Sequence, residues 1–454
     1  MRSGISVVLL ACCAAAVSAR EQVSRDFQKS VALAGGRTLR IEHSMGNITI
    51  HTHASGEVQI SASIKCSSSR ADEAREGCDR IKIEVDESGS GVRVRTEYPS
   101  SDFFARWHNL SYSVNYDITM PETAALELRN RFGAVSVTDL HAPASIDSGN
   151  GKVLLTGGHG RQRIENSFGD VEVTHCDGDV TIVNTNGQVT ANDIGGALDV
   201  RNHFGGIRAT GIGRRVDINA GNADIAVSGV GGPVAVTDSF GKVTVRDAKA
   251  DVTVQNQNGP VEVTGVTGTA DLRNSFDSVR FSRIARDVTV HAQNSHVTGD
   301  TVGGSAVLDT SFGGIDLHGV VGGAKATAGN SNIRLTDIGG EVYAKTSFEG
   351  VTVEDVAGPI TVDNQSGSVT VRAKAVKKCA PIALNTSFGP IKLVVAQGVG
   401  YDVTAKTSFG QIRSEPAITV SGPLGGDSQV SGKIAGGGCQ IRLMDQSGSI
   451  DIVN

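Results

Sequence analysis

Aromatic residues other than Phe are scarce in this chain, and so are the conformationally rigid prolines. The 454 residues include one Trp, five Tyr, four Met and 10 Pro, against 57 Gly. Charges of both signs are scattered, and the formal net charge is -6. No basic tract suits nucleic acid or an anionic membrane surface, so nucleic acid is not an expected partner. Beyond residue 130, Val, Thr, Ile, Asn, Asp, Ser and Gly dominate, which is typical of short strands joined by tight turns.

Long hydrophobic runs are also missing, except at the start of the chain. Residues 1–19 combine Arg2, an apolar core and small residues ending at Ala19, which predicts a signal peptide cleaved after that residue. The letters LLAC at 9–12 also resemble a lipobox, which would place a lipid anchor on Cys12. No later run approaches the roughly 20 apolar residues of a transmembrane helix. We therefore expect an exported protein, in the periplasm, at the outer membrane surface or outside the cell.

Cysteines are few, and their number beyond the leader is odd. Five follow residue 19, which leaves at least one thiol without a partner in the chain. No CxxC motif occurs, and no Cys/His spacing suits zinc. Cys66 and Cys78 flank a stretch typical of a short surface helix, and we predict a disulfide between them that stabilises the fold by about 3 kcal/mol. The pairing of the remaining three is left open: Cys176, Cys379 and Cys439.

Phenylalanine marks an internal repeat. Nine of the 13 Phe form one series. The first seven are spaced 36 residues apart, and the last two follow after steps of 40 and 21 residues. A second signature, such as Asn186-Gly187, lies midway between successive Phe, so the unit is 18 residues and alternates a Phe version with an Asn version. This structural repeat ladder comprises Phe132, Phe168, Phe204, Phe240, Phe276, Phe312, Phe348, Phe388 and Phe409.

Each 18-residue unit contains two stretches in which apolar and polar residues alternate. Val171 and Val173 form one such pair, and Val180 and Ile182 form the next, with a turn between them. One unit alone buries too few side chains to fold. Because the same residues recur at one phase, we predict an all-β fold, a parallel β-solenoid (β-helix) of 18-residue coils with two short strands per coil. An antiparallel meander is the competing interpretation.

The repeated Phe has two interpretations. The Gly that follows it allows a sharp turn, so the ring can fill a corner or part of the core where its neighbours are small. We take this structural role as the first interpretation. The alternative is an exposed Phe ladder that binds a ligand.

Three regions follow from these patterns. Residues 1–19 form the signal peptide, residues 20–120 form the first coils plus an insertion with the short helix, and residues 121–454 form the repeat solenoid. The insertion is expected to cap one end, because a bare terminal coil exposes unpaired strand edges. The chain ends at 448–454, still in strand pattern, so we expect that end to be covered by irregular segments or by a partner.

The order of these motifs resembles the bacterial putative-adhesin family with β-strand repeats, a domain of unknown function. The resemblance is carried by the leader, by GRTLRIEHSMGNITIHT at 36–52, by YSVNYDITMPETAALELRNRFGAVSV at 112–137, and by the G-x-V-x-V units that follow. It spans essentially the whole mature chain. The resemblance implies an exported β-helical protein and supplies no catalytic or ligand-binding residues.

No pattern in the sequence identifies a catalytic, cofactor or metal site. Nucleophile-elbow, zinc-protease, P-loop and dinucleotide motifs are absent. The GGxGxD turns of calcium-binding β-rolls are missing, and His51 and His53 lack a predictable third ligand. A polysaccharide-acting β-helix enzyme would align charged residues along one groove. Such a patch can be assembled from Asp170, Asp179, Arg201, Arg208, Asp217 and Arg246.

The sequence therefore favours a non-enzymatic envelope or cell-surface protein. Its solenoid would present a long polar β-face to an envelope polymer, another cell or a protein partner. One alternative is a polysaccharide-acting enzyme on the same scaffold. Another is a structural periplasmic module that docks a partner at its C-terminal end.

Overall fold

The computed structural model describes residues 20–99, 110–374, 379–420 and 428–454. The predicted signal peptide at 1–19 and the lipobox residue Cys12 lie outside these described residues. The chain divides into two compact units, unit 1 (Met1–Val137) and unit 2 (Thr138–Asn454), which are described separately.

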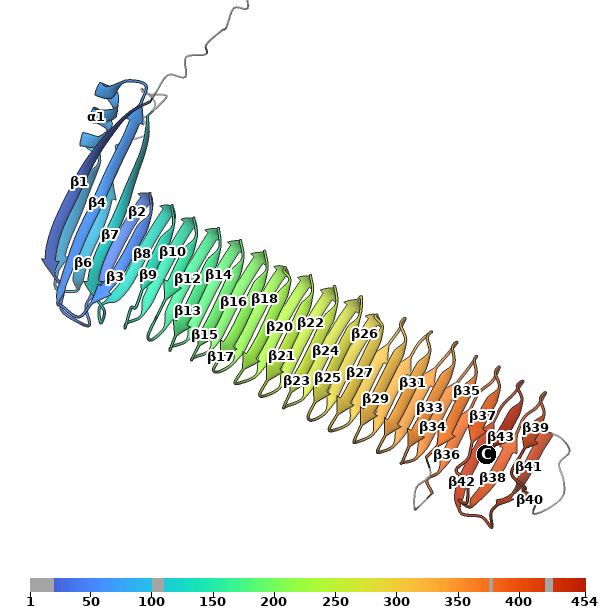
Figure 1. Ribbon diagram of the computed structural model, residues 1–454. Coiled ribbons are helices and arrows are strands. Elements are labelled where there is room, and N and C mark those ends of the chain that lie inside the picture. Colours follow the sequence, from blue (N-terminus) through green and yellow to red (C-terminus); the bar gives the residue numbers. More distant parts are fainter. Residues whose placement is uncertain (1–19, 100–109, 375–378, 421–427) are drawn as a thin grey trace, which may run out of the picture. The chain divides into compact units, whose positions relative to one another are not determined.

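Unit 2 is the predicted parallel β-solenoid, and the chain passes once through each of two sheets in every coil (Figure 1). One sheet, sheet B, contains β10 (Ala144–Asn150), β12 (Gln162–Phe168), β14 (Val180–Asn186), β16 (Leu198–Phe204), β18 (Val216–Asn222), β20 (Val234–Phe240), β22 (Val252–Asn258), β24 (Ala270–Phe276), β26 (Val288–Asn294), β28 (Ala306–Thr310), β30 (Ala324–Ala328), β32 (Val342–Thr346), β34 (Ile360–Asn364) and β36 (Ile382–Asn385). The other, sheet A, contains β11 (Val153–Thr156), β13 (Val171–Cys176), β15 (Val189–Ile194), β17 (Ile207–Ile212), β19 (Ile225–Val230), β21 (Val243–Ala248), β23 (Val261–Val266), β25 (Val279–Ile284), β27 (Val297–Val302), β29 (Ile315–Val320), β31 (Ile333–Ile338), β33 (Val351–Val356), β35 (Val369–Ala373) and β37 (Ile391–Val394).

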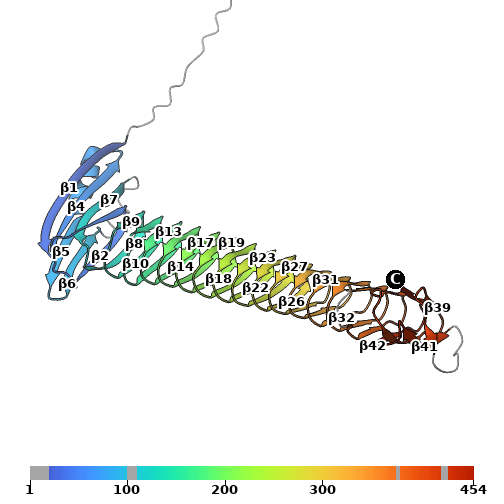
Figure 2. The same cartoon turned by 60° about the horizontal axis from the view of Figure 1, so that its bottom comes forward.

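Successive strands within each sheet pair in parallel at a register of one 18-residue coil. Ile164 of β12 lies opposite Ile182 of β14, and Val173 of β13 lies opposite Ala191 of β15. This register confirms the predicted solenoid and excludes the antiparallel meander for these strands. Figure 2 shows the coils stacked one upon another along unit 2.

The core of unit 2 consists of stacked rows of Val, Ile, Leu and Ala between the two sheets. Ile164, Ile182 and Val200 occupy one such row, and each is at most 1% exposed. Each buried aliphatic side chain stabilises the fold by about 1.5–3 kcal/mol, so the period-two pattern of the strands is the main source of stability. Cys176 is buried in this core and, unlike the other two cysteines of unit 2, forms no disulfide.

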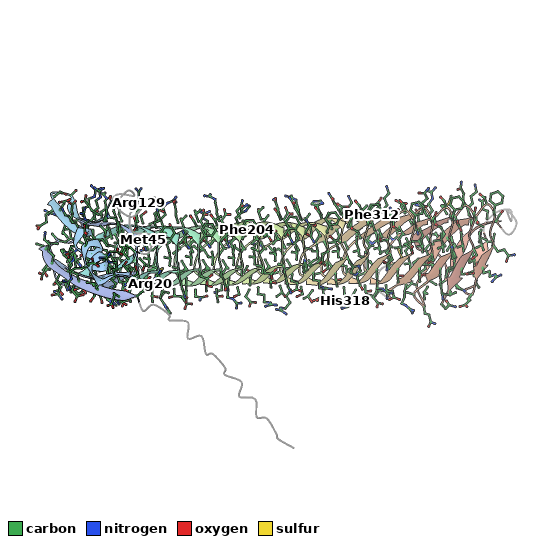
Figure 3. All side chains as sticks on the ribbon, turned by 90° about the horizontal axis from the view of Figure 1, so that it is seen from above. Arg20, Met45, Arg129, Phe204, Phe312 and His318 are labelled. Atoms are coloured by element: carbon green, nitrogen blue, oxygen red, sulfur yellow. A yellow bond between two sulfur atoms is a disulfide. The ribbon has the colours of Figure 1, made fainter. Side chains whose placement is uncertain are left out.

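The turn from sheet B to sheet A, which we call the Phe turn, contains the repeated Phe or its Asn counterpart. Gly169 adopts a φ of +121°, and a Cβ there would lie 2.4 Å from the Gly151 carbonyl oxygen one coil below, so only glycine fits. The buried Asn166 amide donates to the carbonyls of Gly169 (3.0 Å) and Gly151 (3.3 Å). Figure 3 shows Phe204 and Phe312 on one side of unit 2 and His318 on the opposite side.

The end of unit 2 is not a simple continuation of the coils. The last strands are β38 (Tyr401–Lys406), β39 (Ile412–Ser414), β40 (Thr419–Val420), β41 (Gln429–Ile434), β42 (Cys439–Met444) and β43 (Ile450–Val453). Strand β42 lies between β36 and β38, and β43 lies between β37 and β39. The other edge of β38 is covered by antiparallel β41, which also pairs with β40.

The last residues of the chain are therefore not the terminal coil that their place in the sequence suggested, whereas docking of a partner at this end stays a prediction. Residues 439–454 form an internal coil with parallel neighbours on both sides. A disulfide between Cys379 and Cys439 fastens the start of this coil and settles the pairing that the sequence left open.

Unit 1 consists of two small sheets and a helix. One sheet runs β1 (Glu21–Ala32), β4 (Glu57–Ser68), β7 (Ser111–Pro121), β3 (Ile48–His53) and β9 (Val135–Thr138); its first three strands are antiparallel and the rest parallel. The other runs β5 (Lys82–Ser88), β6 (Gly91–Glu97), β2 (Thr38–Met45) and β8 (Ala125–Phe132). Met45 lies opposite Phe132, so Met takes the Phe position of the repeat there.

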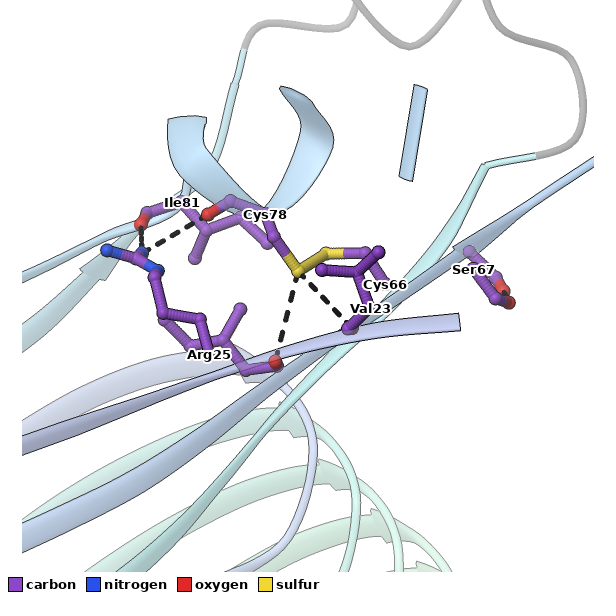
Figure 4. Close-up of a disulfide and its surroundings, with 8 residues drawn as sticks. Val23, Arg25, Cys66, Ser67, Cys78 and Ile81 are labelled. Carbon is purple, nitrogen blue, oxygen red and sulfur yellow. Dashed lines mark hydrogen bonds between the residues drawn. A yellow bond between two sulfur atoms is a disulfide. The ribbon is translucent and has the colours of Figure 1, made fainter. Parts of the chain in front are cut away.

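The predicted short helix is present as α1 (Ala71–Arg80). The Cys66–Cys78 disulfide joins it to β4, as Figure 4 shows. The Arg25 guanidinium on β1 donates hydrogen bonds to the backbone carbonyls of Cys78 and Ile81, at the C-terminal end of the helix. Strand β1 is thus held to the helix as well as to β4.

Candidate functional site

The repeated Phe side chains of unit 2 lie on the surface. Their exposed fractions run from 45% at Phe204 to 85% at Phe409. In the early coils each Phe is the last residue of a sheet B strand, and from Phe312 onward it lies within the Phe turn itself. We call this row the Phe edge; its members are Phe168, Phe204, Phe240, Phe276, Phe312, Phe348, Phe388 and Phe409. Phe132, at the end of β8 in unit 1, is 44% exposed.

The rings do not fill the corner because another side chain already does so. Two residues before the Phe position, Asn166 points inward and is 5% exposed, and its amide closes the turn. Strand pairing then omits the next residue and resumes at Phe168, which lies opposite Asn186. The strand bends at this omission, so Phe168 turns outward although strict alternation would place it inside with Ile164.

Phe and polar coils alternate along the Phe edge. Phe204 lies between Asn186 and Asn222, and Phe240 lies between Asn222 and Asn258. Successive rings are therefore two coils apart, which corresponds to about 10 Å at the usual strand spacing. The edge is a row of separate rings with amide side chains between them, and it is not a continuous apolar strip.

The inserted C-terminal coil preserves this alternation at the end of unit 2. Phe388 and Phe409 are separated by 21 residues, close to one coil in sequence. The turn of the inserted coil, at Gly448, stacks between the turns that follow Phe388 and Phe409. A Cβ added at Gly448 would clash with the carbonyl oxygen of Gly389, and a Cβ added at Gly410 would clash with the carbonyl oxygen of Gly448. Ser447 therefore supplies the polar position between the last two rings. The irregular spacing of Phe388 and Phe409 in the sequence therefore corresponds to the usual spacing of two coils in the structure.

Two members of the inward row beside the Phe edge are acidic, Asp238 and Asp445. Asp238 takes the position that is Asn at 166, 184, 202, 256 and 274, and it is 1% exposed. Neither of its carboxylate oxygens has a hydrogen bond of good geometry within the described residues, although the backbone N–H groups of Ser239, Phe240 and Ala223 lie close enough to favour the charged form. Burial, with a smaller contribution from Asp224, raises the pKa of Asp238 to about 6. The buried carboxyl group of Asp238 is therefore a local weak point in this inward row.

The six charged residues proposed for an enzymatic groove do not meet on one face. Asp170 and Asp179 lie in turns, where each accepts a backbone N–H from the next coil, at Gln188 and Ala197 respectively, both at 2.9 Å. Two others point outward from sheet B, and two from sheet A. The sheet B pair is Arg201 and Asp217, and the sheet A pair is Arg208 and Arg246.

The histidine pair in unit 1 is engaged in local contacts. The His53 ring contacts the Ser55 hydroxyl at 2.8 Å and the Glu57 carbonyl at 2.7 Å, while His51 points into solvent. Across the described ranges, no three His, Cys, Asp or Glu side chains are grouped closely enough to hold a metal ion. Within the same ranges no helix is long and apolar enough to cross a membrane.

Comparison with known proteins gives structural neighbours only. No family model and no curated protein matches the sequence. A "putative cell adhesion protein" from Clostridium sporogenes is 9% identical, with 95% of this chain and 99% of that chain covered and a TM-score of 0.18. A "putative lipid binding protein" from Parabacteroides distasonis is 12% identical (82% and 97% covered, TM-score 0.18), and a "putative adhesin" from the same organism is 9% identical (81% and 96%, TM-score 0.17).

The names of the first and third neighbours agree with the family resemblance that the sequence motifs carry. TM-scores this far below 0.5, at such low identity, carry no argument about activity. The functional interpretation therefore rests on the residues of this chain.

Proposed function

We propose that this protein is an exported, non-enzymatic adhesin-like scaffold that binds an extended polysaccharide along the Phe edge. The observation that carries the proposal is the row of half-exposed rings at two-coil intervals in unit 2. Single exposed apolar residues are common on protein surfaces, but eight rings repeated at one phase form a regular series that a repeating ligand can match. A solenoid repeats its surface at every coil, so it suits a ligand that is itself a repeating chain.

The alternation of rings and amides favours a polysaccharide over a protein partner. The core of a protein interface is a contiguous, well-packed apolar patch. The Phe edge instead places Asn186, Asn222 or another polar residue between neighbouring rings. Sugar rings have apolar C–H faces that stack on aromatic rings, and their hydroxyls pair with amides. A repeat of about 10 Å is also close to the length of one disaccharide in an extended chain.

The two alternatives have less support. A polysaccharide-acting enzyme needs its acid, base and substrate contacts in one cleft, whereas the six charged residues considered for that role are divided between turns and two faces. Docking of a partner at the C-terminal end has less support because β41 already covers the outer edge of β38, and residues 439–454 lie between neighbouring coils.

Pull-down on insoluble polysaccharides tests the proposal. We expect the mature protein to bind at least one extended glycan, and Phe204→Ser/Phe240→Ser/Phe276→Ser to bind it at least about tenfold more weakly, because each lost stacking contact contributes about 0.5–1.5 kcal/mol. Val321→Ser is the matched control, since Val321 is 72% exposed but lies in the opposite turn. Equal binding by the triple variant and the parent would contradict a role for the Phe edge.

A further inference from the structure

A groove opens on sheet A directly beside the Phe edge. Its volume is about 510 Å³, and it spans four coils, from Gln188 in the first to Lys242 and Arg246 in the last. It exists because Ala226, on β19, is the small outward residue between Arg208 on β17 and Thr244 on β21. Most outward positions of sheet A carry longer side chains, which fill the space above their neighbours.

The walls of the groove are predominantly basic. Arg208 and Arg246 are exposed, and neither has an ion pair or hydrogen bond from its side chain within the described residues. Lys242 is paired with Glu262 at 2.9 Å, outside the groove lining. The one acidic lining residue, Asp224, uses a carboxylate oxygen to accept the Lys242 backbone N–H at 2.9 Å. Two guanidinium groups thus remain free to bind an anion.

The floor of the groove supplies a neutral polar group. Thr244 points outward from β21 but is only 8% exposed, and its hydroxyl has no partner in the described part of the chain. The hydroxyl oxygen itself is not fully buried, so it is open to solvent at the floor of the groove and can pair with a ligand. A hydroxyl at the base and two free guanidinium groups at the sides are complementary to a carboxylate, which accepts several hydrogen bonds at once.

The groove and the Phe edge are adjacent parts of one surface. The lining residues Gly206 and Lys242 lie two positions after Phe204 and Phe240 in their respective Phe turns. The coil between those two rings carries Asn222 in the Phe position, so no ring separates the edge from the groove at that level. A chain bound along the Phe edge can therefore extend a substituent into the groove.

We propose that the polysaccharide is acidic, and that a uronate carboxylate of the chain binds in the groove between Arg208 and Arg246, above Thr244. This inference rests on the proposed function, because the Phe edge positions the sugar that carries the carboxylate. Arg is well suited to this role, since its planar fork pairs with both oxygens of a carboxylate.

Calorimetry with the mature protein tests the assignment with two forms of one polymer. Polygalacturonate carries a carboxylate on every sugar, whereas its fully methyl-esterified form has the same backbone without the charge. We expect tighter binding of the free acid, and a loss of at least about tenfold in Arg208→Ala/Arg246→Ala, because each removed guanidinium is a charge-assisted contact. The advantage of the acid should shrink at high salt. Arg334→Ala, at the corresponding outward position on β31 opposite Asp316, is the matched control.

The outcomes separate this inference from the proposed function. If the arginine variant binds both polymers as the parent does, while Phe204→Ser/Phe240→Ser/Phe276→Ser loses both, the uronate site is refuted and the Phe edge stands. If the phenylalanine variant retains both polymers, the proposed function fails. If duplex DNA displaces polygalacturonate at equal charge concentration, the groove is a general polyanion site and the uronate assignment is overturned.

Discussion

At the scale of single residues, the buried Asp238 gives the clearest prediction. Replacing it with Asn should stabilise the protein at neutral pH by about 1–3 kcal/mol, because an amide donates to the turn carbonyls as Asn256 does to Gly241 (3.1 Å) and Gly259 (3.0 Å). The pKa of Asp238 is raised to about 6. The folded protein therefore holds this proton more tightly than the unfolded chain, and stability from Asp238 is lost as pH rises through 6.

The pH dependence gives this prediction its control. Because Asn does not titrate, the advantage of Asp238→Asn should be largest above pH 6 and should shrink toward pH 4. Denaturant midpoints across that range measure it. Asn256→Asp makes the opposite substitution one coil away, and it should destabilise the protein at neutral pH. An unchanged midpoint in both variants at pH 7.5 would mean that the carboxylate finds partners that the structure does not contain.

The Phe edge shows what the sequence can and cannot predict about a residue. The repeat of Phe at 36-residue steps predicted the coil, the turn and the position of each ring along the chain. It favoured an inward position for the ring, because Phe168 lies two and four residues after the inward residues Asn166 and Ile164, whereas the ring is exposed. At Phe168 the inward side chain of Asn166 already occupies the corner, and the next residue drops out of the strand pairing before the ring. That signal was present in the sequence as a polar residue two positions before every Phe of the series: Asn in four cases, Asp in one and Thr in four.

At the scale of an element, the inserted coil β42–β43 should depend on its disulfide. Cys379 and Cys439 close a loop of 60 residues, so the cross-link should disfavour opening of this coil by up to about 4 kcal/mol. In Cys379→Ser/Cys439→Ser, amide exchange in β42 and β43 should accelerate strongly. Central strands such as β20 should exchange as before, because coils contact only their neighbours.

A matched cysteine variant separates this effect from the loss of any thiol. Cys176→Ser changes a buried thiol that forms no disulfide, so it should leave β42 and β43 protected. If the double variant and the parent exchange alike in these strands, the strand contacts alone hold the coil in place. Loss of protection throughout unit 2 would instead show that its coils unfold together.

Neither the insertion nor its disulfide could be predicted from the periodic pattern. Ile441 has the same inward aliphatic character as Ile382 and Val403, its neighbours on either side, so any coil of this pattern fits next to any other. The sequence fragment at 448–454 correctly indicated a strand, but periodicity carries no information on the order of coils in space. The 21-residue step between Phe388 and Phe409 was the visible trace, because it is too short for two coils.

At the scale of the whole molecule, unit 2 is a quasi-one-dimensional array. Each coil buries its aliphatic residues against the coil above and the coil below, and stability is close to a sum of coil and interface contributions. The Phe–polar alternation imposes a second, longer period of two coils on the same array. The fold therefore repeats every 18 residues, whereas the proposed binding surface repeats every 36.

A deletion that respects both periods should leave the protein folded. Removing residues 277–312 takes out two coils and joins Phe276 to Gly313, which follows the next Phe in the parent chain. We expect a circular dichroism spectrum and melting temperature close to those of the parent, and unit 2 shortened by about 10 Å in small-angle scattering. Removing 277–311 instead leaves one extra residue at the junction and shifts inward side chains outward there. This second variant should melt earlier; if the two deletions are equally destabilising, register between coils is not what holds unit 2 together.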